Sequence, residues 1–143
     1  MCHEQMPSIN GDPPTLDGVV LEAIVCTEHW PDGEFEAANV IYFLVHNTWH
    51  RLYFDCGTVF WRQDVDFVPN YRGPATADSP FVNRDLGAEL SIAGRTISSC
   101  VTEAVGDHES RVSFHFVGGG TVSFTCIGDI TSVDHSGLAD RGT

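Results

Sequence analysis

Residues 111–126 read RVSFHFVGGGTVSFTC, and they decide the fold class. Val112, Phe114 and Phe116 alternate with polar residues before three glycines, and the alternation resumes after the glycines with the same period of two. That period is typical of β-strands, whose successive side chains point to opposite faces of a sheet. The stretch therefore predicts a β-hairpin with one buried face and one face in contact with water.

Short runs of β-branched and aromatic residues recur on both sides of this hairpin, and helical periodicity is nearly absent. Such runs, separated by Gly, Asn and Asp, predict strands joined by tight turns. The chain is therefore expected to be all-β, a single small antiparallel β-barrel or sandwich of about eight strands with hairpin connections. Outside the hairpin, the expected strands span residues 16–27, 38–46, 49–55, 58–63, 88–92, 96–105 and 130–133.

The chain of 143 residues fits one domain. We expect residues 1–14 to be a flexible N-terminal arm, residues 15–134 to form a single β domain, and residues 135–143 to be a polar C-terminal tail. Within the domain, residues 64–87 contain three prolines and show no clean period, so they are expected to form one long central loop. Loops of this length are often functional.

The chain is strongly acidic, with 20 Asp and Glu against 7 arginines, no lysine and a formal net charge of -13. Nucleic acid and anionic membrane surfaces are polyanions, so this charge disfavours both as partners. A basic protein is the partner class that an acidic surface attracts, because complementary fields steer association.

The chain lacks the sequence features of secretion and membrane insertion. No apolar run approaches the roughly 20 residues that a transmembrane helix needs, and Met1 to Pro14 contain no apolar signal-peptide segment. We therefore expect a cytoplasmic protein. The five cysteines are an odd number without CxxC spacing, which favours free thiols.

Histidines and carboxylates raise the question of a metal or hydrolytic site. His46 and His50 have a spacing that aligns two ligands only on a helix, and here a turn intervenes. A metal-assisted hydrolase that uses loop histidines and carboxylates is therefore kept only as a second alternative, and no cofactor or metal is predicted. The loop residues in question are Asp107, His108, Glu109, Asp129, Asp134 and His135.

Three further features favour structural over catalytic roles. Cys56 follows Asp55 in an expected turn, and a neighbouring carboxylate raises rather than lowers a thiol pKa. The glycines at 118–120 join two strands and open no helix, so they do not predict a phosphate loop. His115 shares the polar face of its strand with Arg111, which makes it an ordinary exterior residue unless another element covers that face.

Two segments carry the features of a protein-binding surface. Residues 28–36, EHWPDGEFE, place four carboxylates around two aromatic rings, and aromatic anchors with a charged rim are typical of binding patches. Residues 64–87 add the aromatic side chain of Tyr71 and the cationic side chain of Arg72. The candidate partner-binding residues are Glu28, Trp30, Asp32, Glu34, Phe35, Glu36, Tyr71 and Arg72.

These observations favour a non-enzymatic protein-interaction module for a basic partner, comparable to a bacterial immunity protein that masks a toxin. The first alternative is a β-barrel that encloses a small apolar molecule and uses residues 64–87 as a lid. The sequence leaves the oligomeric state open.

Overall fold

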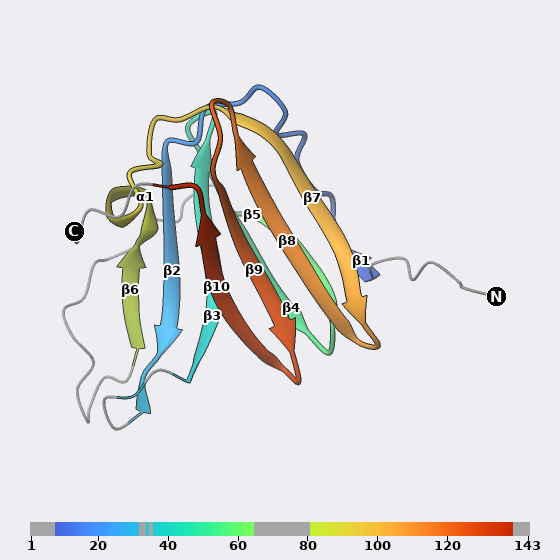
Figure 1. Cartoon of the computed structure of the whole chain (residues 1–143). Helices are drawn as coiled ribbons and strands as arrows, with labels where there is room; N and C mark the ends of the chain where they lie inside the picture. Colours follow the sequence, from blue (N-terminus) through green and yellow to red (C-terminus); the bar gives the residue numbers. More distant parts are fainter. Residues whose placement is uncertain (1–7, 32–33, 35, 65–80, 139–143) are drawn as a thin grey trace.

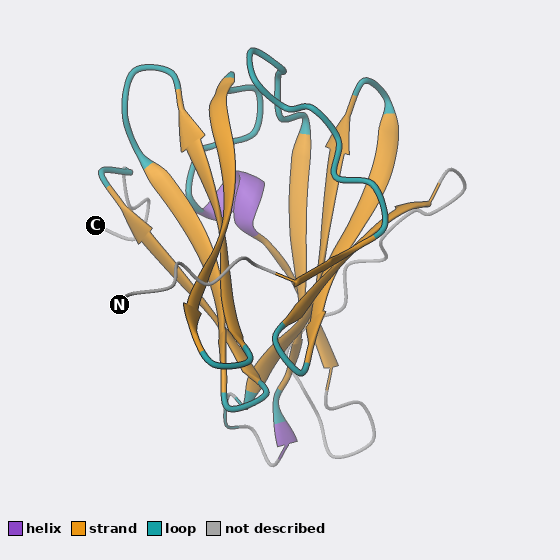
Figure 2. Cartoon of the chain, turned by 90° about the vertical axis from the view of Figure 1, so that its right-hand side faces the viewer, coloured by secondary structure: helices purple, strands orange, loops and turns teal. Residues whose placement is uncertain are grey.

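The computed structural model describes residues 8–31, 34, 36–64 and 81–138 of the chain. Two β-sheets pack face to face, with the smaller sheet in front of the larger one in the view of Figure 1. The sheets stay separate at their edges and do not close into a barrel (Figure 2). The all-β class expected from the sequence is confirmed, and of its two forms the molecule adopts the sandwich.

The larger sheet contains six strands. They are β1 (Ser8–Asn10), β2 (Ala23–His29), β3 (Ala37–Val45), β4 (Thr48–Asp55), β5 (Thr58–Asp64) and β6 (Phe81–Asp85). Their order in the sheet is β1-β5-β4-β3-β2-β6. All neighbours are antiparallel except β1 and β5, which pair in parallel.

The smaller sheet is an antiparallel meander of four strands. They are β7 (Ile97–Gly106), β8 (Glu109–Phe116), β9 (Thr121–Ile127) and β10 (Ile130–Ser136). Their order, β10-β9-β8-β7, follows the chain. The strands β8 and β9 are those expected from residues 111–126, and Val112 lies directly opposite Phe124 as the alternation predicts.

Aromatic side chains fill the space between the sheets. Phe43 of β3 contacts Phe114 of β8 edge to face, with ring centroids 5.5 Å apart, and Phe114 contacts Phe124 of β9 at 6.1 Å. All three rings are fully buried. Since such rings contribute large apolar areas, this cluster is the centre of the core. The interior expected to hold a ligand in the barrel alternative is thus occupied here by side chains.

The segment 64–87 differs from the expected long loop. Its last residues form β6, which pairs with β2, and the short helix α1 (Leu86–Glu89) follows directly. The strand expected over residues 88–92 is therefore wrong. Asp85 caps the helix through a hydrogen bond from the Ala88 amide at 3.1 Å, and Leu86 and Leu90 are buried on one side of the turn.

The ends of the β domain also differ from expectation. The strand expected from residue 16 begins only at Ala23: residues 16–22 form a connection that buries Leu16 and Leu21 and pairs with the segment before β7 through the isolated bridge between Val20 and Thr96. Ser8–Asn10, expected within a flexible arm, pair with β5, and β10 extends to Ser136. No helix of the described residues has the length and apolar character to cross a membrane.

Candidate functional site

Glu28, expected on a partner-facing surface, is buried instead. Only 1% of the surface of Glu28 is exposed. The residue follows Ile24 and Cys26 on the inward side of β2. The indole Nε1 of Trp30 donates a hydrogen bond to Glu28 Oε1 at 3.0 Å. A carboxylate this deeply buried must have charged or hydrogen-bonding partners, so its role is structural.

Arg84 of β6 is the charged partner of Glu28. Its Nη1 lies 3.2 Å from Glu28 Oε2, while Nε and Nη2 donate to both carboxylate oxygens of Glu89 at 2.7 and 2.6 Å. These hydrogen bonds to Glu89 are the largest cause that raises the pKa of Arg84 above its ordinary value. The Glu28–Arg84–Glu89 cluster ties β2, β6 and α1 together.

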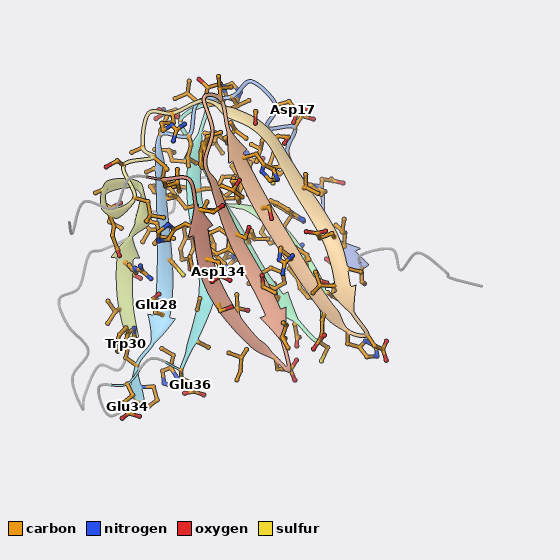
Figure 3. The ribbon with its side chains drawn as sticks, viewed as in Figure 1. Asp17, Glu28, Trp30, Glu34, Glu36 and Asp134 are labelled. Carbon is orange, nitrogen blue, oxygen red and sulfur yellow. The ribbon has the colours of Figure 1, made fainter. Side chains whose placement is uncertain are left out.

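Glu34 and Glu36 are the described residues of the predicted patch that remain exposed. Glu36 Oε2 lies 2.7 Å from His29 Nδ1, and the Glu36 amide donates to the His29 carbonyl, so the base of the β2–β3 loop is held together. Trp30 is half-buried (Figure 3). Asp32, Phe35, Tyr71 and Arg72 lie outside the described residues.

A second group of acidic residues lies at the end of the sandwich where the β4–β5, β7–β8 and β9–β10 hairpins turn (Figure 1). Two of these turns touch: a Cβ added to Gly57 would meet the backbone of His108, and the Ser110 hydroxyl donates to the Gly57 carbonyl. Gly57 has φ +79°, as the tight turn requires. We call this region the hairpin end.

The hairpin end is acidic and hollowed. Two adjoining grooves of about 370 and 410 Å³ share Cys56, Asp107, His108 and Glu109, and Asp129 lines the second. The three turn segments 55–58, 106–109 and 127–130 contain no arginine. His108, whose Nε2 lies 3.8 Å from Asp107 Oδ1, is the possible cation in these turn segments, so carboxylates predominate at the grooves and their field attracts cationic groups.

Apolar side chains adjoin these carboxylates. Ile127 and Ile130 lie directly opposite each other at the β9–β10 turn and are 53% and 51% exposed. An exposed apolar pair beside charged residues is a pattern typical of protein-binding surfaces. The sequence indicates the loop carboxylates one by one but does not predict this patch, because the three turns that form it lie far apart in the chain.

Cys56 is the exposed thiol of the hairpin end. A hydrogen bond with Asp55, the negative charge of Asp55 and that of Asp129 raise its pKa above the ordinary value. Burial raises the pKa of Cys100 to about 12, and it also raises the pKa of Cys26 and Cys126. Since the thiolate is the reactive form, none of these four cysteines is an activated nucleophile.

We expect Cys56 to react with a disulfide reagent such as DTNB more slowly than glutathione does at pH 8, with a rate that still rises above pH 9. The raised pKa leaves little thiolate at neutral pH. The measurement is a pH series of stopped-flow rates in a Cys2→Ser background. Asp55→Asn should accelerate the reaction and Asp107→Asn should not; a rate that levels off below pH 8 would indicate an activated thiol.

Metal chemistry gains no support within the described part of the chain. There, no group of three or more His, Cys, Asp or Glu side chains is arranged to hold a metal ion. His46 lies in the β3–β4 turn with φ 49°, while His50 stacks on Phe43 with centroids 5.1 Å apart, so the two histidines do not form a ligand pair. The glycines at 118–120 form the β8–β9 turn, all with positive φ.

Comparisons of this chain with protein-family models, with curated proteins and with solved structures find no match.

Proposed function

We propose that the protein is a non-enzymatic interaction module that binds a basic protein through its hairpin end. The observation that carries the proposal is the junction of three hairpin turns, which brings Asp107, Glu109 and Asp129 around adjoining grooves. Ile127 and Ile130 add apolar contact area beside these charges. Complementary charge increases the association rate and excludes acidic competitors, while the apolar pair supplies affinity.

The β2–β3 loop extends the acidic surface at the same end of the sandwich. Glu34 and Glu36 lie at the lower edge of the molecule in Figure 3, on the side toward which the three hairpins turn. This loop contributes the carboxylates of Glu34 and Glu36 to the proposed surface, whereas the sequence predicted four. Of the other two, Glu28 is buried and Asp32 lies outside the described residues.

A partner of this kind would be masked rather than processed. The proposed surface presents carboxylates and aliphatic side chains beside His108 and the thiol of Cys56, whose pKa is raised. In the part of the chain that the structure describes, no group of His, Cys, Asp and Glu side chains is arranged to hold a metal ion. The role we propose is therefore comparable to that of a bacterial immunity protein, which covers the functional surface of a basic toxin with an acidic one.

Affinity capture from a lysate of the source organism tests this function. The immobilised protein should retain a basic protein at low salt and release it at about 0.5 M salt, where charges are screened beyond about 4–5 Å. An unrelated acidic protein immobilised at the same density is the control for simple ion exchange. Retention of nothing beyond the control, or retention that does not respond to salt, would contradict the proposal.

A further inference from the structure

The outer face of the β7–β10 sheet carries a polar groove that lies apart from the grooves of the hairpin end. The strand register places outward side chains in rows across the sheet. In the central row, Val101 lies opposite Ser113, Ser113 opposite Ser123, and Ser123 opposite Asp134. Because the two serines are small and their neighbours are larger, the row is hollow in the middle. The groove has a volume of about 370 Å³.

Hydrogen bonds between strands fix the floor of this groove. Ser113 Oγ and Ser123 Oγ lie 2.9 Å apart, and Ser113 is only 5% exposed. In the next row, His115 Nδ1 and Thr121 Oγ1 share a hydrogen bond of 2.9 Å. Each hydroxyl can donate once and accept twice, so these pairs leave hydrogen-bonding capacity that points into the groove.

The charged groups of the groove stand at its sides. Arg111 donates from Nε to Thr125 Oγ1 at 3.0 Å, and its Nη1 lies 3.6 Å from Glu103 Oε1. The side-chain carboxylate of Asp134, on β10 in Figure 3, forms no hydrogen bond or ion pair with the residues that the structure describes. Its exposed carboxylate is therefore an acceptor available to a ligand.

We propose that this groove binds a neutral polyhydroxylated ligand, a carbohydrate. The carboxylates of Asp134 and Glu103 disfavour an anion, and the hydroxyl floor disfavours an apolar molecule. Sugar hydroxyls both donate and accept, as do the serines and threonines here, and they match the acceptor Asp134 together with the donor Arg111. Val101, 42% exposed, offers an apolar contact to the C–H groups of a sugar ring.

NMR titration of the ¹⁵N-labelled protein tests the inference. The probes are glucose, galactose, mannose, N-acetylglucosamine, maltose and cellobiose, each added to about 20 mM because open grooves of this size bind weakly. We expect at least one sugar to shift amide signals of the central and His115 rows, with the rest of the sandwich unchanged. No shift with any sugar, or shifts confined to other parts of the chain, would overturn it.

Two variants separate binding from folding. Asp134→Asn keeps the shape of the side chain and removes its charge, and we expect it to weaken sugar binding about tenfold. Ser123→Val fills the hollow with a residue that suits a strand, and should abolish the shifts. Asp17→Asn, which lies outside the groove lining at the end of the sandwich remote from the hairpin end, is the control and should bind as the wild type does (Figure 3). Undiminished binding by both groove variants, with unchanged melting, would also overturn the inference. If no sugar binds, the proposal that the hairpin end binds a basic protein is unaffected, because the two surfaces share no lining residue.

Discussion

Replacing Arg84 by methionine is expected to lower the free energy of unfolding by about 3–5 kcal/mol, because it leaves the Glu28 carboxylate buried without its charged partner. Glu28 is 2% exposed at its side chain and lies 3.2 Å from the guanidinium. The hydrogen bond from Trp30 remains in the variant, but one neutral donor does not replace a cation. Urea unfolding followed by tryptophan fluorescence measures the loss.

Two further variants identify the cause of that loss. Arg111→Met removes a surface ion pair to Glu103 at 3.6 Å and one hydrogen bond to Thr125, and should cost about 1–2 kcal/mol, less than Arg84→Met. The double variant Glu28→Leu/Arg84→Met removes both charges and should recover most of the stability. If Arg84→Met were no more destabilising than Arg111→Met, the Glu28–Arg84–Glu89 cluster would not have the structural role assigned to it.

Glu28 shows where single-sequence reasoning stops. Its position in an acidic, aromatic loop segment predicted exposure, and the local pattern contains nothing that contradicts this. The residue that makes burial possible is Arg84, 56 positions further along the chain. Only the pairing of β6 with β2 brings the two together, and β6 itself lies in the segment expected to be a loop.

Strands and turns were predictable where local chemistry determines them. The alternation in residues 111–126 predicts that the apolar side chains of β8 and β9 are buried, and the structure confirms this. It does not predict that Ser113 and Thr125, on the face expected to contact water, are buried as well. The expected strands 38–46 and 49–55 leave residues 47 and 48 for the turn, whereas the β3–β4 turn falls one residue earlier, on His46 and Asn47, with φ of 49° and 58°. Both values are positive because a two-residue turn of this type matches the strand twist.

The hairpin end was not predictable as a surface. Each turn could be found separately from its Gly and Asp residues, but their junction depends on how two sheets pack. The contact between Gly57 and His108 joins turns from different sheets, and a serine 53 positions away donates to the Gly57 carbonyl. The sheet order, which no local pattern encodes, decides which carboxylates become neighbours.

The second large expected effect concerns partner binding. Asp107→Asn/Asp129→Asn removes two negative charges from the grooves of the hairpin end while it preserves side-chain shape. We expect the affinity for the basic partner to fall at least about tenfold, mainly through slower association at low salt. Both residues are exposed, so the folded structure should be retained.

The most direct test of the proposed function is isothermal titration of the captured basic protein into two double variants of equal net charge. The control, Asp17→Asn/Glu22→Gln, also removes two negative charges, but at the opposite end of the sandwich. The glutamine retains an oxygen that accepts the hydrogen bond from the Asn47 amide. The account predicts a loss of at least about tenfold for the hairpin-end variant and less than about threefold for the control. Equal losses in the two variants would show that only net charge matters and would contradict an interface at the hairpin end.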